Sequence, residues 1–330
     1  MNTFYWLVKR EFWEHRGGFL WAPVITVTAV VAVNIMLIIM AAVAGSNHNN
    51  FSLLWNQLAA ASPEHLKQAG QIMDAVAFLP TLIVSIVLFF VLFSYCMKTL
   101  STDRADRSIL FWKSLPLSDL STVLSKVFSA VIVVPVIAAV ACAVGALLIY
   151  LLLAITGAMH GLGFGQILWT VPHPGRTIVS IFGMLPIYMI WMLPAVGWLM
   201  MCSAWSKGRV SRWAVALPIV LATVVTWVNV MVSGAHASNW FWKQVVLRII
   251  ASLCPGSWLW REGHYGVPIF RASYNSHNGV LAQSSFDNVF SGILAPQYHL
   301  LLTPEFLWGA LAGAVMIGIA IWLRRWRTEL

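Results

Sequence analysis

Charged residues are scarce in this sequence: Asp, Glu, Lys and Arg make up 9% of its 330 residues, whereas hydrophobic residues make up 60%. Soluble domains carry about a quarter charged residues, so this chain cannot cover a globule with polar side chains. Glycine and proline occur at ordinary levels and charged blocks are absent, which excludes collagen-like, disordered and coiled-coil classes. The composition predicts an integral membrane protein.

Motifs for catalysis and metal binding are also missing. The sequence contains no GxxxxGK[ST] phosphate loop, no HExxH and no GxSxG. Its cysteines are far apart, with no CxxC or Cys/His metal spacing, and we expect them to be buried small hydrophobic residues: Cys96, Cys142, Cys202 and Cys254. We therefore expect no catalytic residue, no metal site and no disulfide framework.

Long uncharged runs separate short clusters of Lys and Arg, which together give a net charge of +9. This distribution forms no continuous basic face, so we expect no nucleic-acid partner. A membrane helix needs about 20 apolar residues, and the runs predict six spans: 19–45, 75–97, 127–154, one between 176 and 207, 213–233 and 306–323.

Most of the 20 Lys and Arg fall on one side of the membrane when the N-terminus is placed inside, as the positive-inside rule requires. A seventh span at 240–260 would put the arginine-rich C-terminal tail outside, and Pro255 and Gly256 interrupt a helix there. We therefore predict that both termini are cytoplasmic and that 240–260 is an interfacial or re-entrant segment on the outer side.

The predicted spans carry no charged residue or histidine in their cores, which argues against a carrier driven by protons or sodium ions. Asn34 and Asn229 are candidates for a substrate pathway, although hydrogen bonds between helices explain such residues more often. A pathway without buried charge, rich in Trp, Phe, Leu and Met, suggests an apolar or amphipathic cargo.

The N-terminal residues have an amphipathic pattern. Phe4, Leu7, Val8 and Phe12 follow the spacing of one helix face, with Lys9 and the other charged residues largely on another. This predicts a short helix at the inner membrane surface. The alternative is a solvated basic flank that only sets topology.

The cytoplasmic loop 98–126 predicts a helix–turn–helix. A first helix over 103–115 would pair Asp103 with Arg107 and end at Pro116, and Ser118 would cap a second helix that runs into the third span. The apolar residues of this loop suit a surface on which a partner presses. The alternative is a loop that packs on its own membrane domain.

The order of these motifs resembles the permease subunits of ABC-2 type exporters. In the loop the matching residues are Asp103-Arg104, Asp106-Arg107-Ser108, Leu110, Ser114-Leu115-Pro116, Ser118 and Lys126. At the N-terminus they are Val8 to Phe12 with Glu14-His15-Arg16, and in the fourth span Leu193-Pro194, Gly197-Trp198 and Ser203-Ala204-Trp205. The resemblance covers most of residues 1–220. Two features depart from the family: Asp stands where Glu is common in the acidic run, and the outer segment 237–304 is longer.

The resemblance implies an all-α ABC-2 (type V) exporter fold with six transmembrane helices and an N-terminal interface helix. It divides the chain into an interface helix (1–18), five spans with the coupling loop (19–236), an extracytoplasmic segment with a re-entrant helix as one interpretation (237–304), and a sixth span with a basic tail (305–330). It also implies a location in a bacterial inner membrane.

By the same resemblance, the chain would pair with a second permease copy or a paralogue, in contact with membrane lipid. It would not itself be an enzyme and would hold no cofactor, because a separate ATP-binding cassette subunit would bind ATP and Mg. The residues expected to dock that subunit are Arg104, Arg107, Phe111, Trp112, Leu115 and Pro116.

Two other functions remain open. The chain would serve as a membrane anchor or sensor if the same loop recruits a cytoplasmic partner without transport. It would be a lipid-modifying membrane enzyme if the outer residues His264, His277, His299 and Asp287 formed a site, although no paired acid, base or nucleophile motif supports this.

Overall fold

The structure is a computed structural model that describes residues 3–48, 63–105, 118–165, 172–206, 210–233, 241–258, 298 and 301–326. Within these ranges every regular element is a helix and none is a strand. The elements are α1 (Thr3–Glu14), η1 (Gly17–Trp21), α2 (Ala22–His48), α4 (Pro63–Ala105), α6 (Asp119–Phe128), η2 (Ser129–Val133), α7 (Val134–Met159), α8 (Pro174–Gly183), α9 (Leu185–Trp191), α10 (Leu193–Trp205), α11 (Val210–Ser233), η5 (Trp242–Val246), α12 (Leu247–Ala251) and α16 (Pro304–Trp326).

Five stretches of helix are long and apolar enough to cross a membrane, and they lie in η1–α2, α4, α6–η2–α7, α11 and α16. A sixth arises if the helices from Pro174 to Trp191 and from Leu193 to Trp205 form one span, which bends by 46°. Pro186 and Pro194 each follow a break in this stretch and stand at the start of the next helix. Proline lacks an N–H and is tolerated in the first turn. The described chain is therefore an all-helical, multi-pass membrane protein.

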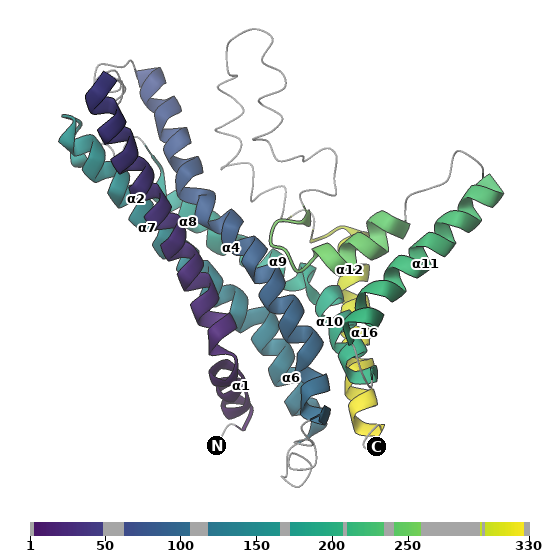
Figure 1. The fold of residues 1–330 in the computed structure, drawn as a ribbon. Helices are drawn as coiled ribbons and strands as arrows, with labels where there is room; N and C mark the ends of the chain where they lie inside the picture. Colours follow the sequence, from purple (N-terminus) through teal and green to yellow (C-terminus); the bar gives the residue numbers. More distant parts are fainter. Residues whose placement is uncertain are drawn as a thin grey trace.

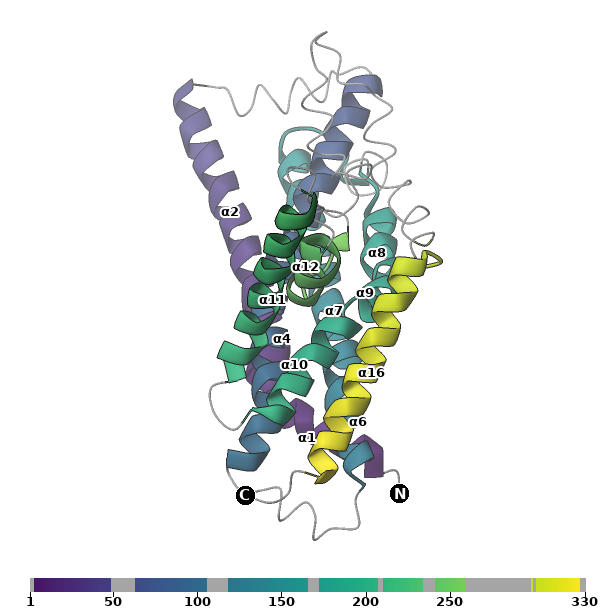
Figure 2. The ribbon, with the colours of Figure 1, turned by 90° about the vertical axis from the view of Figure 1, so that its right-hand side faces the viewer.

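The continuous helix α6–η2–α7 is the most enclosed of these spans. In its apolar window 50% of the residues are buried, against 11% for the windows of α2 and α11. Figure 1 shows α2 and α11 on opposite sides of the structure, and Figure 2 shows the same arrangement turned by 90°. Both chain termini lie at one end (Figure 1), which we call the terminal end; the opposite end is the far end.

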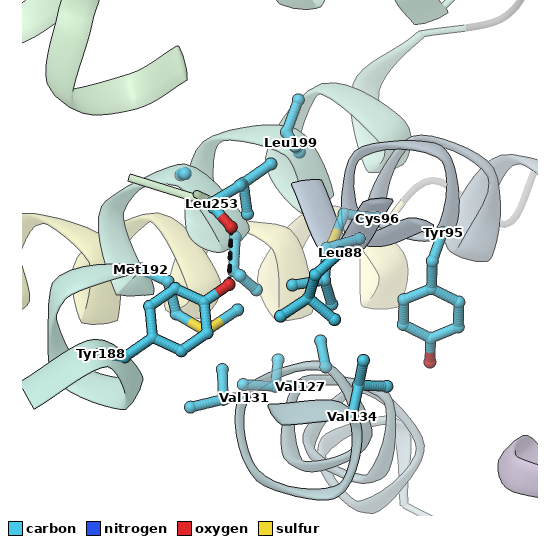
Figure 3. Close-up of a cluster of buried hydrophobic side chains, with 14 of the residues drawn as sticks. Leu88, Tyr95, Cys96, Val127, Val131, Val134, Tyr188, Met192, Leu199 and Leu253 are labelled. Atoms are coloured by element: carbon cyan, nitrogen blue, oxygen red, sulfur yellow. Dashed lines mark hydrogen bonds between the residues drawn. The ribbon is translucent and has the colours of Figure 1, made fainter. Parts of the chain in front are cut away.

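The core is formed where α4, α6–α7 and α9–α10 meet. Figure 3 shows its side chains converging from these helices, and they include Leu88, Cys96, Val127, Val131, Val134, Met192 and Leu199. Tyr188 donates a hydrogen bond of 2.6 Å to the carbonyl oxygen of Leu253, which brings the segment after α12 into the same core. Tyr95 lies at the edge of the cluster, with its hydroxyl directed away from it (Figure 3).

Helices α10 and α16 pack through glycine. A Cβ at Gly197 would lie 2.5 Å from the carbonyl oxygen of Gly313, and a Cβ at Gly313 would lie 2.5 Å from the carbonyl carbon of Leu193. Gly309 and Gly313 form a GxxxG spacing on α16, the pattern that lets membrane helices approach closely. Close contact of these two backbones therefore depends on the absence of side chains.

Residues 241–258, within the segment predicted to be interfacial or re-entrant, form two short helical stretches and a turn. Leu253 and Trp258 are buried, and Trp191 of α9 donates a hydrogen bond of 3.0 Å to Ser257 Oγ. Gly256 has a φ of 82°, a left-handed conformation that glycine adopts without steric cost. This turn lets the chain leave α12 while its apolar side chains stay in the core.

Candidate functional site: a buried charge network at the terminal end

Lys126 is the centre of a buried charge network. Its Nζ lies 2.9 Å from Oε1 of Glu11 on α1 and 3.5 Å from Oδ2 of Asp103 on α4. It also donates hydrogen bonds of 3.2 Å to both the carbonyl and the hydroxyl oxygen of Thr99. Because the Lys126 side chain is 5% exposed, protein groups rather than water must compensate its charge.

Arg324 extends the network to α16. Its Nη1 lies 3.2 Å from Oδ2 of Asp103, and its Nε lies 3.4 Å from Oδ1 of Asp119 on α6. Asp119 is in the first turn of its helix and Arg324 in the last turn of its own, so each charge has the sign that the helix dipole favours. One carboxylate, that of Asp103, therefore contacts both buried cations.

Glu11 joins the network because of its place on α1. It follows Leu7 by four residues, and these two are the buried residues of that helix, since positions four apart share a face. The hydroxyl of Tyr95 donates a hydrogen bond of 3.0 Å to Glu11 Oε2, and Nδ1 of His15 lies 3.9 Å from the same oxygen. The acidic group thus faces the bundle, where α4 and α6 meet it.

Ser203 of α10 binds the backbone of α4 just before this network. Its hydroxyl accepts hydrogen bonds from the N–H groups of Leu100 (3.2 Å) and Ser101 (3.0 Å), and it donates one of 2.8 Å to the carbonyl of Met97. Ser203 therefore attaches α10 to the last turns of α4, which Lys126 also contacts through Thr99.

The network flanks the segment 106–117, which lies outside the described residues. Asp103 precedes this segment on α4 and Asp119 follows it on α6, and both contact Arg324. Ser118 caps α6 as the sequence predicted, with its Oγ accepting a hydrogen bond of 3.1 Å from the N–H of Ser121. Within the predicted coupling loop 98–126, residues on both sides of 106–117 thus contact the same arginine of α16.

Most residues predicted to dock an ATPase subunit lie outside the described part of the chain. Arg104 is in the last turn of α4, directly after Asp103. The others fall within 106–117: Arg107, Phe111, Trp112, Leu115 and Pro116. Their role, and that of Arg104, stays a prediction.

Asn34 and Asn229, the candidates for a substrate pathway, are on helices that lie apart. Asn34 Nδ2 donates a hydrogen bond of 2.9 Å to the carbonyl of Val30 on its own helix α2. Asn229 is half-buried on α11, on the opposite side of the structure (Figure 1). The structure does not bring the two amides together, and a pathway role for either stays a prediction.

Sequence reasoning missed the structural role of Glu11, Lys126 and Arg324. The sequence places Glu11 in the N-terminal interface helix and Lys126 and Arg324 among the cytoplasmic charges that set topology, whereas in the structure these residues are 3%, 4% and 7% exposed. Lys126 stands between the apolar neighbours Val123 and Val127 of an amphipathic helix, which was the available signal for a buried lysine. No comparable local signal identifies Asp103 as the partner of both cations.

A second buried acid, Asp74, lies toward the far end. Its Oδ1 accepts hydrogen bonds from the Tyr150 hydroxyl (2.6 Å) and from the backbone N–H of His173 (3.0 Å). The Tyr150 hydroxyl is also 2.8 Å from Thr177 Oγ1, and His173 Nδ1 lies 3.7 Å from Asp74 Oδ2. These contacts fasten α4 to α7 and to the start of α8.

Arg248 of α12 is buried against the first turn of α16. It donates hydrogen bonds to the carbonyls of Glu305 and Phe306, and its guanidinium carbon lies 4.7 Å from the centre of the Trp191 ring. Its guanidinium also occupies the space that a side chain at Gly309 would need. The arginine thereby links the segment 241–258 to both α9 and α16.

Metal chemistry gains no support from the described residues, among which no group of three or more His, Cys, Asp or Glu could hold an ion. The outer residues considered for an enzyme site, His264, His277, Asp287 and His299, lie outside them. Comparison of the chain with protein-family models, curated proteins and solved structures gave no match in any of the three. The function is therefore argued from the residues and contacts above.

Proposed function

We propose that this chain is the permease subunit of an ATP-binding cassette exporter of the ABC-2 type, in which the segment 106–117 contacts a separate ATPase subunit. The observation that supports this is the attachment of both flanks of the segment to the buried charge network. A displacement of the segment by the ATPase subunit would move α4 and α6, which flank it. Because Asp103 and Asp119 both contact Arg324, α16 would move with them.

The network is suited to transmit such a push because its charges are costly to separate. Breaking a buried ion pair leaves an uncompensated charge, at a cost of about 3–5 kcal/mol. When the ATPase subunit displaces the segment, the helices that share the network would therefore move together rather than break their ion pairs. Since α4, α6–η2–α7 and α16 are all long membrane-spanning helices, a tilt that begins at the terminal end would reach the far end.

In this proposal the terminal end faces the cytoplasm of a bacterial cell, where ATP and Mg are bound by the partner subunit. A second copy of the chain or a paralogue would complete the transport pathway through the inner membrane. An apolar or amphipathic cargo fits a chain whose described spans carry mainly hydrophobic side chains on their exposed faces.

The first experiment is affinity purification of the tagged chain from native membranes in mild detergent, followed by mass spectrometry. Recovery of an ATP-binding cassette subunit in near-equal amount, together with ATP-dependent flux after reconstitution, would support the proposal. A cassette subunit without flux would favour the anchor or sensor function. Recovery of the chain alone, or with an unrelated envelope protein, would overturn the proposal.

A second experiment tests the docking residues. The double variant F111A/W112A should lose most of the cassette subunit in the same purification, because aromatic residues dominate the energy of many protein interfaces. The matched control is W322A/W326A, which removes two exposed tryptophans from α16. Equal recovery of the cassette subunit with the first variant and with the unaltered chain would contradict the role of 106–117.

A further inference from the structure

The outward face of α1 combines aromatic and basic side chains. Its exposed members include Tyr5, Trp6, Lys9 and Trp13, and the exposed Arg16, two residues after the end of α1, continues this face. The Lys9 ammonium lies 4.8 Å from the centre of the Trp6 ring, and the Arg16 guanidinium carbon lies 5.8 Å from that of Trp13. Each exposed indole thus carries a cation over its face.

The positive charge of this face exceeds its negative charge. Arg10 and Glu14 form an exposed pair with 3.3 Å between Nη2 and Oε2, so their charges offset each other. Lys9 and Arg16 are held against neutral rings, which orient them without cancelling their charge. The face consequently presents two fixed cations to its surroundings.

This face continues directly into a surface that must contact lipid. Arg16 stands immediately before the membrane-spanning stretch that begins at Gly17. The next exposed side chains along the helix are apolar: Leu20, Trp21 and Ile25. Figure 1 shows α1 following on from the lower end of α2. Tryptophans and basic residues beside a span typically lie at the level of the lipid headgroups.

We infer that this face of α1 binds the headgroups of anionic phospholipids in the leaflet at the terminal end. The two cations supply attraction for phosphate, and Trp6 and Trp13 supply the amphipathic rings that favour the interface. The opposite face of the same helix carries Glu11, the partner of Lys126. Bound headgroups would therefore hold α1 in the position that the buried charge network requires.

Native mass spectrometry of the purified full chain in detergent tests this inference. Phosphatidylglycerol and phosphatidylcholine are titrated separately, and individual lipid-binding constants are compared between the unaltered chain and K9Q/R16Q. The double variant removes both cations of this face, so it should bind phosphatidylglycerol more weakly, by about fivefold for two exposed ion contacts. Its binding of phosphatidylcholine, whose phosphate is offset by the choline cation, should fall much less.

The matched control, R212Q/R325Q, removes two exposed arginines from α11 and α16. The inference requires that this control lose much less affinity for phosphatidylglycerol than K9Q/R16Q does. Equal losses of phosphatidylglycerol affinity in the two variants would show that only the net charge of the protein matters, and would overturn the inference. If K9Q/R16Q bound lipid as the unaltered chain does but no longer co-purified with an acidic protein, the inference would also be overturned, because the face would then dock a protein. Since the lipid titration needs no ATPase subunit, its outcome is independent of the proposed transport function.

Discussion

Lys126 on α6 and Glu11 on α1 form a buried ion pair with 2.9 Å between Nζ and Oε1, and their side chains are 5% and 4% exposed. Such a pair adds little net stability, because removing two charges from water costs about as much as their attraction returns. Its value lies in specificity: any other position of α1 would leave one of the charges buried without its partner. The pair thus fixes the N-terminal helix against α6.

The variant K126M should be strongly destabilised, because it leaves Glu11 buried and removes a cation from Asp103. We expect the free energy of unfolding to fall by about 3–5 kcal/mol, measured by unfolding in mixed micelles with increasing denaturing detergent. The double variant E11Q/K126M should lose clearly less than the sum of the two single variants, since neither charge of the pair is then left alone. K98M, which replaces an exposed lysine of α4, is the control and should change little. Additive losses in the double variant would show that the two residues are not coupled.

Much of the helical architecture was predictable from the sequence, because span length and apolar composition are local properties. The long runs predicted spans that the structure places in α2, α4, α7, α11 and α16, and where the sequence predicted the fourth span the structure has helices that break before Pro186 and Pro194. The network was not predictable in the same way. Asp103 and Arg324 are 221 residues apart, and the local sequence around each residue gives no information about which residue it contacts.

Ser203 supplies the second prediction. Replacing it with alanine leaves the N–H groups of Leu100 and Ser101 without its hydroxyl as acceptor, and a lost buried hydrogen-bond partner costs about 1–3 kcal/mol. S203A should therefore lower stability by that amount and speed amide hydrogen exchange at residues 100 and 101. T223V, at an exposed position whose hydroxyl donates a hydrogen bond to the carbonyl of Ile219 on its own helix α11, is the control. Exchange at 100 and 101 as slow as in the unaltered chain would show that the hydroxyl does not hold α4.

Asp74 gives a third prediction, which separates its charge from its hydrogen bonds. D74N keeps an acceptor oxygen for Tyr150 and for the His173 N–H, whereas D74A removes both contacts. We expect D74A to lower the free energy of unfolding by about 1–3 kcal/mol and D74N to lower it less. The measurement is the same detergent titration. Equal losses in both variants would indicate that the negative charge, with His173 beside it, is what matters.

The packing of α10 on α16 gives a fourth prediction, with a control on the same helix. A Cβ at Gly313 would lie 2.5 Å from the carbonyl carbon of Leu193, and backbone atoms cannot move aside as a side chain can. G313A should therefore separate the two helices and destabilise the protein by about 1–3 kcal/mol, as overpacking does. At Gly318, where nothing lies within 4 Å of an added Cβ, alanine should be neutral or stabilising because of its higher helix propensity.

The two glycine variants make the same chemical change five residues apart on α16, so helix propensity cannot explain a difference of opposite sign between them. The thermal midpoint of each variant in the same detergent is sufficient for the comparison. A G313A protein as stable as G318A would mean that α10 and α16 are not in backbone contact. That result would also mean that a movement of α16, which Arg324 links to Asp103 at the terminal end, is not passed to α10 through backbone contact.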